Sequence, residues 1–414
     1  MRPLFGATCL AVLPLAVWPG LERPFSLPKL IWLVVATMAL VAVRVVGGPV
    51  AARHARAVPH AVERTSAWLV TLWLVGFLVA SLAAPLPSLE ALTLGLVAPL
   101  FALALTQVTQ APVRLLTGQV VGATACAVVA LAQWARADPF VVAGWQPPID
   151  GASVRMRVYG TLGNPNFVGV LMAMTLPLTV AILASATDAG RRRSAWAALA
   201  VQAGALIATG SRGAVLGLAA AVVVYAILRW GRRERIGLAA VAVLAVVAIA
   251  ISPARPIDTT AAGRLHLWRI VGPRVREAPW VGQGPGAVTL RFPQWQRSAA
   301  REGVRDRRFA GLTDHVHNDY LETLVERGLL GLSALVAPLV VLTVVAVRMR
   351  RRMSPVQAGA IAAVAAGAAC ALVDFPLARP TELAWWWVAI IVALGATPAA
   401  SSGIRPDASR LPDA

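Results

Sequence analysis

The sequence predicts an all-α polytopic membrane protein with about twelve transmembrane helices and one large polar loop between the ninth and tenth. Of its 414 residues, 58% are hydrophobic and only 14% are charged, whereas a soluble domain usually carries about a quarter charged residues. Apolar runs of about 20 residues, each enough to cross a ~30 Å hydrocarbon core, recur along the chain. We therefore expect a single transmembrane domain over residues 1–397 and a disordered cytoplasmic tail over 398–414.

The predicted spans follow the apolar runs. They cover residues 3–19, 29–47, 67–84, 89–109, 114–134, 164–184, 195–210, 213–229, 236–252, 329–347, 355–373 and 381–397. The first run imitates a secretory signal, but no small-x-small cleavage site closes it and further spans follow at once. We expect it to remain as an uncleaved first helix.

Arginine-rich connections occur on alternate loops of this layout. They contain Arg44, Arg53, Arg56 and Arg64, then Arg114, then Arg191 to Arg193, then Arg229, Arg232, Arg233 and Arg235, and finally Arg348 and Arg350 to Arg352. Because positively charged short loops stay in the cytoplasm, these loops and both termini are predicted to be cytoplasmic. The loops 20–28, 85–88, 135–163, 210–213, 253–328 and 374–380 are then predicted to face outward.

The net charge of +19 does not indicate nucleic-acid binding, because the arginines are dispersed among short loops. One outward loop is nevertheless cationic: residues 253–316 hold eleven arginines against five acids. Attraction to anionic lipid headgroups, worth about 1 kcal/mol per residue, is one explanation. An anionic substrate such as a lipid diphosphate is another, and the two are compatible. The cysteines, Cys9, Cys126 and Cys370, lie in apolar runs and predict neither disulfides nor a metal site.

The most polar stretch of the chain is residues 314–322, which contains His315 and His317 just before an apolar run. We expect a helix over 316–327, with Asp314 as its N-cap and Gly328 as its C′ residue. His317 would then lie in the first turn, where the helix dipole favours a neutral imidazole. A neutral histidine can accept a proton, as a general base must.

Other polar residues are predicted at the same outer face. Arg212 lies in a hairpin between two spans, Asn164 in a Gly/Asn/Pro turn, and Asp374 and Arg379 in the last outer loop. Each could be an ordinary turn or snorkelling residue. Together with His317, however, they place a base, several guanidinium groups and a carboxylate at one membrane face, which indicates a catalytic or binding site.

Two segments of the large loop have predicted local structure. Residues 263–268 (GRLHLW) are expected to form a short helix, and residues 279–286 (PWVGQGPG) a tight turn. Glycine at every second position of that turn would let backbone N–H groups approach a ligand closely.

The order of these segments resembles the O-antigen ligase superfamily, which joins O-antigen ligases, O-antigen and exopolysaccharide polymerases and some protein O-oligosaccharyltransferases. The resemblance centres on His317-Asn318, then nine residues, then Gly328-Leu329-Leu330-Gly331. The other matching segments are Gly163-Asn164-Pro165-Asn166, Ser211-Arg212-Gly213 and the segments 263–268 and 279–286.

The resemblance implies a GT-C-like fold and a metal-independent, cofactor-free, inverting glycosyl transfer at the periplasmic face of the bacterial inner membrane. It implies undecaprenyl-diphosphate-linked glycan as donor and lipid A-core or a similar glycolipid or glycan as acceptor. By the same resemblance, His317 is the base or acceptor-positioning group, and Arg212 and Arg264 bind the diphosphate. Asn164, Asn318, Asp374 and Arg379 are expected to support the site. His315 either shares the proton relay or is structural.

Three alternatives remain open. A polymerase would share these motifs and differ only in the acceptor. A transporter usually carries ionisable residues in mid-span, but the middles of the predicted spans contain almost none. A non-catalytic scaffold is disfavoured by the histidine and arginine arrangement. The choice among ligase, polymerase and protein glycosylation cannot be made from these residues.

Overall fold

Every regular element in the described part of the chain is helical. The computed structural model describes residues 2–46, 60–84, 87–108, 112–144, 158–231, 233–234, 236–237, 259–309 and 311–395. None of these residues forms a strand, so the all-α prediction is confirmed for them. The predicted span 236–252, apart from its first two residues, and the predicted tail 398–414 lie outside the described residues.

The long helices follow the other predicted spans. They are α1 (Arg2–Val12, continued by the 3₁₀ turn η1, Leu13–Leu15), α2 (Leu27–Val46), α4 (His60–Ala83), α5 (Leu89–Val108), α6 (Pro112–Trp134), α8 (Pro165–Ala184), α9 (Ala189–Thr209), α10 (Arg212–Arg229), α14 (Asp319–Met349), α15 (Pro355–Cys370) and α16 (Pro380–Gly395). Among the described helices, seven are long and apolar enough to cross a membrane: α2, α4, α5, α6, α8, α10 and α14. The η1-extended first helix, α15 and α16 are apolar but shorter. These helices indicate a multi-pass membrane protein, and the count of twelve spans stays a prediction.

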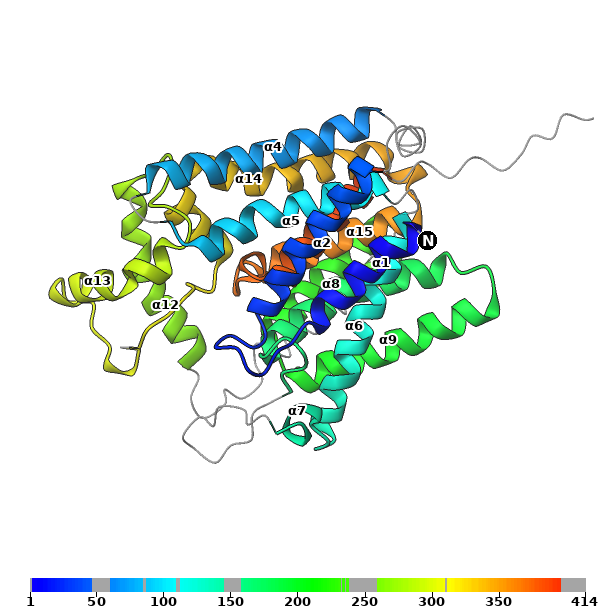
Figure 1. Ribbon diagram of the computed structural model, residues 1–414, viewed down its shortest axis with the longest axis horizontal. Coiled ribbons are helices and arrows are strands. Elements are labelled where there is room, and N and C mark those ends of the chain that lie inside the picture. Colours follow the sequence, from blue (N-terminus) through cyan, green and yellow to red (C-terminus); the bar gives the residue numbers. More distant parts are fainter. Residues whose placement is uncertain are drawn as a thin grey trace, which may run out of the picture.

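The centre of the bundle is built from helices that are buried on nearly all sides. Helix α8 packs against α6, α9, α10 and α15, and α16 packs against α5 and α15 (Figure 1). Trp385, Trp386 and Trp387 of α16 are each at most 2% exposed, as expected for a helix that is apolar around its circumference. A Cβ atom on Gly217 of α10 would lie 2.3 Å from Cys370 Sγ of α15, so a small residue permits this close helix approach.

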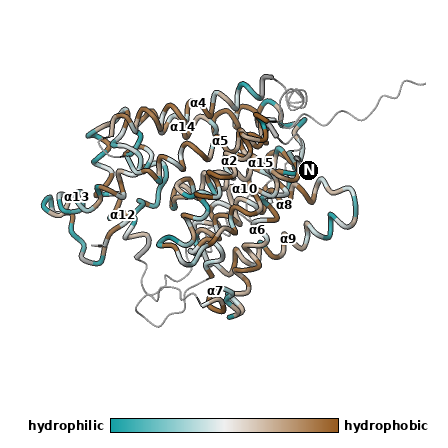
Figure 2. The backbone as a smooth tube through the Cα atoms, in the orientation of Figure 1, coloured by the Kyte–Doolittle hydropathy of each residue, from teal (hydrophilic) through white to brown (hydrophobic). Residues whose placement is uncertain are grey.

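The polar part of the chain lies at one end of the bundle, where Figure 2 shows hydrophilic residues around α12 and α13. Here lie α12 (Thr259–Val271), the 3₁₀ turn η2 (Gly272–Glu277), α13 (Ala287–Arg301) and η3 (Arg307–Phe309). The predicted helix over 263–268 is confirmed as part of α12. These elements pack around a small apolar core that includes Ile270, Phe292, Trp295 and Val316.

Loops predicted to face outward contact one another at this end. Their contacts include the hydrogen bond from Ser88 N to Pro285 O (2.8 Å), the bond from Leu377 N to Asp319 Oδ2 (2.9 Å), and the edge contact between the Phe25 and Tyr159 rings (5.9 Å). These contacts agree with the prediction that the loops without arginine clusters lie on the same side of the membrane. Which side of the membrane this end faces stays a prediction.

Helix α14 is broken at Gly328, and the glycine-rich turn 279–286 fills the break. Gly328 has φ +62° and ψ −162°, which is not helical. The amides of Gln283 and Gly284 donate to the carbonyls of Val325 and Glu326, at 2.9 and 2.8 Å. On the far side of the break, Leu329 N donates to Pro279 O at 2.8 Å and Leu330 N to Trp280 O at 3.1 Å. The turn therefore supplies the backbone partners that a helix break inside a membrane protein requires.

This finding revises the expected role of the glycines. A Cβ atom on Gly282, whose φ is +71°, would lie 2.3 Å from Arg327 N. The close approach that the glycines allow is thus to the backbone of α14. The amides of Gln283 and Gly284 are occupied by α14 rather than available to a ligand.

Candidate active site

The stretch 314–322 forms the entry to α14, which begins at Asp319 rather than at residue 316. Its N-cap is Asn318, whose Oδ1 accepts a hydrogen bond from Leu321 N at 2.9 Å and whose Nδ2 donates to Leu372 O at 3.1 Å. The predictions of Asp314 as N-cap and of His317 in the first turn are therefore wrong. The amide oxygen of Asn318 caps the helix, so the helix dipole argument for a neutral His317 no longer applies.

His317 has a φ of +55°, a conformation that is uncommon outside glycine and tends to occur at functional sites. Its side chain is 33% exposed. The Nδ1 atom is buried and has no hydrogen-bond partner among the described residues, so the exposed part of the side chain lies away from Nδ1. The ring also meets Phe375 edge-on, with the centroids 5.0 Å apart.

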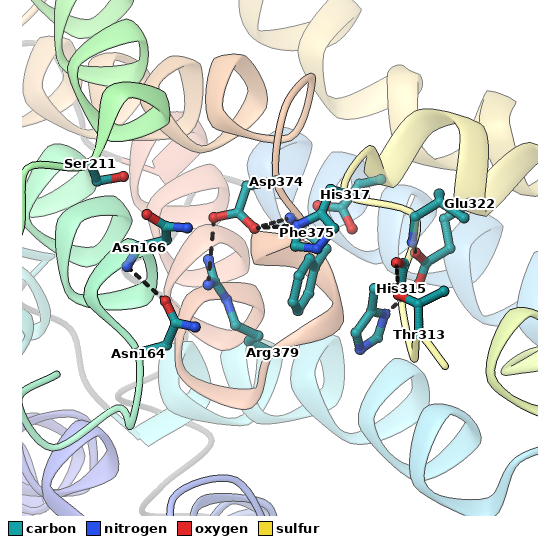
Figure 3. Close-up of polar contacts among 12 residues, drawn as sticks. Asn164, Asn166, Ser211, Thr313, His315, His317, Glu322, Asp374, Phe375 and Arg379 are labelled. Carbon is teal, nitrogen blue, oxygen red and sulfur yellow. Dashed lines mark hydrogen bonds and ion pairs between the residues drawn. The ribbon is translucent and has the colours of Figure 1, made fainter. Parts of the chain in front are cut away.

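Asp374 lies behind His317, in the loop between α15 and α16 (Figure 3). Its Oδ1 is 3.7 Å from His317 Nδ1, and its Oδ2 is 3.9 Å from Arg379 Nη1. Burial alone would raise the pKa of this carboxyl, but the Arg379 charge and the nearby imidazole outweigh burial and lower the pKa below its ordinary value. Asp374 is therefore an ionised carboxylate next to the candidate base.

His315 is held by a carboxylate of α14. Its Nδ1 lies 2.7 Å from Glu322 Oε1, while Glu322 Oε2 accepts a hydrogen bond from Val316 N at 2.9 Å. Burial lowers the pKa of His315, but the charge of Glu322 and its hydrogen bond raise it further, to about 9. The ring stacks on Phe375 at 4.2 Å between centroids. His315 thus pairs with Glu322 in this loop, and its part in a proton relay stays a prediction.

Arg212 is the first residue of α10 and is exposed. Its neighbour Gly213 accepts a hydrogen bond from Cys370 Sγ at 3.4 Å, and a Cβ atom there would lie 3.2 Å from Val373. The start of α10 therefore adjoins the loop that carries Asp374.

Arg264 is half-buried on α12. The same helix is fastened to the His317 segment by Trp268, whose Nε1 donates to Val316 O at 2.9 Å. The structure thus places α10 and α12 against the segments that carry Asp374 and His317. The roles of Arg212 and Arg264 in binding a diphosphate stay predictions.

Asn164 caps α8, since its Oδ1 accepts a hydrogen bond from Asn166 N at 2.8 Å. The first turn of α8 then delivers Phe167, whose ring lies 4.0 Å from the guanidinium carbon of Arg379 and 5.4 Å from the Phe375 ring. The Gly/Asn/Pro turn therefore reaches the site through Phe167, and Asn164 itself has a capping role.

Three residues that sequence reasoning did not single out take part in this region. Phe375 contacts both histidine rings. Glu382, on the first turn of α16, has Oε1 at 3.1 Å from Arg379 Nε. Arg327 is buried with its guanidinium over the rings of Trp73 and Phe77. A signal existed for the two charged residues, because an ionisable side chain at the edge of an apolar run is costly unless it has a partner or a function.

A cavity of about 260 Å³ adjoins the His315 side of the site. It is lined by three acids of one α14 face, Asp319, Glu322 and Glu326, together with His315 and Arg327. A second cavity, of about 220 Å³, lies on the Arg379 side.

The comparison with protein families agrees with this geometry. The family model described as O-antigen ligase matches residues 197–336, which include Arg212, Arg264, His315 and His317. No curated protein sequence matches the chain. The matched segment, which contains the His317-Asn318 entry to α14 and the glycine turn that bridges the break in this helix, is similar to the O-antigen ligase family.

Proposed function

We propose that this protein transfers a glycan from undecaprenyl diphosphate to lipid A-core or a similar acceptor, at the periplasmic face of the bacterial inner membrane. The observation that supports this most is the His317–Asp374 pair. An imidazole with one buried edge facing an ionised carboxylate, and the other edge exposed, is arranged as a general base. The match of residues 197–336 to the O-antigen ligase family model supports a glycosyltransferase-like membrane enzyme with lipid-linked glycan substrates in general.

In the proposed reaction, His317 Nε2 removes the proton from an acceptor hydroxyl. The hydroxyl oxygen attacks the anomeric carbon of the donor sugar from the face opposite the diphosphate. The new glycosidic bond forms as the bond between that carbon and the phosphate oxygen breaks, with inversion. The electron pair of the broken bond leaves with the lipid diphosphate, and Asp374 stabilises the imidazolium that has taken up the proton.

The departing diphosphate gains negative charge, which Arg212 and Arg264 are proposed to stabilise. Guanidinium groups bind phosphate oxygens in a bidentate manner. In a site partly closed to water, two of them would lower the barrier by several kcal/mol. In this proposal the arginines do the work that a divalent cation does in metal-dependent transfer, so no metal takes part.

Complementation tests this function and separates it from polymerisation. The wild-type gene would be expressed in a ligase-null strain and in a polymerase-null strain, and the lipopolysaccharide of each would be examined on a gel. Restoration of ladder attachment in the first strain supports the ligase; restoration of chain length in the second supports the polymerase. His317→Ala should restore neither at equal expression, whereas Arg297→Gln, on the exposed side of α13, should behave as wild type. Normal ladders from His317→Ala would refute the assigned role.

A further inference from the structure

Arg379 is a buried guanidinium with no hydrogen-bond partner in the described part of the chain. The residue is 6% exposed, and its Nε, Nη1 and Nη2 atoms all lack an acceptor there. Two carboxylates lie near it, with Glu382 Oε1 at 3.1 Å from Nε and Asp374 Oδ2 at 3.9 Å from Nη1. Neither contact has the geometry of a hydrogen bond. A buried N–H group without a hydrogen-bond acceptor destabilises the protein, so we expect a ligand to supply the acceptor here.

The position of the ring neighbours shows where that acceptor must lie. The guanidinium carbon is 4.0 Å from the centroid of Phe167 and 5.4 Å from that of Phe375. The guanidinium carbon therefore lies over the two rings, and its N–H bonds lie within the guanidinium plane. An acceptor therefore has to approach the edge of the guanidinium. Arg379 lines the cavity of about 220 Å³ described above.

The helix ends around the cavity are a second, independent feature that favours an anion. Its wall is made by the N-terminal ends of three long helices: α2, through Ser26 and Lys29; α8, through Gly163 and Phe167; and α16, through residues 380–382. Helix N-termini carry partial positive charge and attract anions. Lys29 also lines the cavity, but its three donors are already bonded to the carbonyls of Ala16, Phe25 and Thr161.

A hydroxyl group completes the set of donors. Thr381 is fully buried on the wall of the cavity, and its Oγ1 has no hydrogen-bond partner among the described residues. The charged residues that line the cavity are Arg23, Lys29, Arg379 and Glu382, and Arg23 is paired with Glu90 on the neighbouring helix α5. Arg379 and Thr381 thus offer the cavity a guanidinium and a hydroxyl that lack hydrogen-bond partners among the described residues, and phosphate oxygens accept hydrogen bonds from such donors.

We propose that this cavity binds the phosphate group of an anionic lipid through Arg379 and Thr381. The site is separate in its residues from Arg212 and Arg264. It adjoins the candidate base, because Asp374 lies between Arg379 and His317. Two lipids offer this chemistry: a polyprenyl diphosphate and an anionic phospholipid headgroup. The choice of a polyprenyl diphosphate as the bound lipid rests on the proposed function, whereas phosphate binding by the cavity does not.

The test is equilibrium binding by the full-length protein in nanodiscs of neutral lipid. The probe is a fluorescent short polyprenyl diphosphate, competed by inorganic pyrophosphate or by phosphatidylglycerol added to the nanodiscs. Replacement of a charge-assisted hydrogen-bond donor weakens binding by about tenfold to a hundredfold. We expect that loss in Arg379→Gln, a smaller loss in Thr381→Val, and tighter binding in Glu382→Gln, because that change removes the competing carboxylate.

Arg327→Gln is the matched control. Arg327 is also buried and also lies over two aromatic rings, but it donates to Thr323 Oγ1 and lines the other cavity. Its replacement should leave probe affinity unchanged. Should Arg379→Gln fail to fold, Arg379→Lys keeps the charge but loses the planar fork, and it should still weaken binding.

The outcomes distinguish between the two candidate lipids, and between phosphate binding and a cavity that binds no phosphate. Competition by pyrophosphate supports the polyprenyl diphosphate, and competition by phosphatidylglycerol alone supports the headgroup. Binding that is indifferent to Arg379, Thr381 and Glu382 overturns the proposal and leaves a water-filled cavity around a structural ion cluster. Loss of probe binding in Arg379→Gln with no glycan transfer by wild type would sustain this site while refuting the proposed function. Glycan transfer by wild type, combined with probe binding that does not depend on Arg379, would support the proposed function and refute this phosphate site.

Discussion

The imidazole of His317 presents its buried Nδ1 to Asp374, whose Oδ1 lies 3.7 Å away. Asp374 is held in turn by the amide of Phe375 at 2.9 Å and lies 3.9 Å from Arg379 Nη1. A fixed carboxylate behind an imidazole sets the orientation of the ring and stabilises its protonated form. The exposed edge of His317 is then free for a substrate.

Asp374→Asn should slow glycan transfer without unfolding the protein. The amide has nearly the shape of the carboxylate but cannot stabilise an imidazolium by charge, so we expect the rate to fall by about tenfold to a hundredfold. Transfer by purified protein from a lipid-linked glycan to acceptor measures this. Asp306→Asn, at a half-buried loop position where the carboxylate pairs with Arg308, is the control. A rate equal to wild type would remove Asp374 from the mechanism.

Arg212→Gln and Arg264→Gln should each weaken use of the donor. If both arginines hold the diphosphate, loss of either removes charge-assisted hydrogen bonds to the leaving group and lowers kcat/KM for donor. The lysine variants should recover part of the loss, because they restore charge but not the bidentate geometry. Steady-state kinetics at varied donor concentration would show this. Equal donor kinetics in Arg212→Gln, Arg264→Gln and the exposed control Arg297→Gln would contradict the assignment.

The stability of the protein should fall as pH rises through the range set by His315. Its pKa in the folded protein is about 9 because of Glu322, above the ordinary value near 6.5. The stabilisation by the ion pair is therefore complete below about pH 6.5 and is lost as pH rises towards and through about 9. Thermal unfolding in detergent between pH 6 and 10 should show this loss in wild type and a flatter profile in Glu322→Gln. Parallel profiles would rule out the ion pair as the cause.

The glycine turn should tolerate no side chain. Gly282→Ala would combine a positive φ with a Cβ atom 2.3 Å from the backbone of Arg327. We expect a loss of at least roughly 2 kcal/mol, since the left-handed conformation costs about 1–2 kcal/mol and overpacking adds to it. Gly303→Ala has a positive φ but open space around the Cβ position, so it should show the conformational cost alone. Thermal unfolding compares the two, and equal losses would contradict the packing explanation.

The helices could be predicted from the sequence because the bilayer dictates the length of an apolar span, and runs such as 329–347 therefore appear in the sequence itself. The grouping of outward loops followed from arginine placement, and contacts such as that between Ser88 and Pro285 agree with it. The residues His317, Asp374 and Arg379 were correctly expected to share one region.

The local geometry of the site could not be read in the same way. His317 has a positive φ because the tertiary structure holds it there, and no neighbouring glycine signals it. The competition between Asp314 and Asn318 for the cap was decided by contacts with Leu372, far along the chain. The pairing of His315 with Glu322 and the stacking of Phe375 likewise depend on how segments meet. The periodicity of hydrophobic residues along the sequence contains no information on such tertiary contacts.

The hydrogen bonds across the break in α14 have a mechanical consequence. The turn 279–286 forms hydrogen bonds both to the part of α14 before Gly328 and to the longer part after it. While these hydrogen bonds hold, the two parts of α14 cannot rotate independently, so a tilt of residues 329–349 within the lipid would also move the segment that carries His317. The turn 279–286, the entry to α14 and the rest of α14 are thus expected to move as one rigid unit.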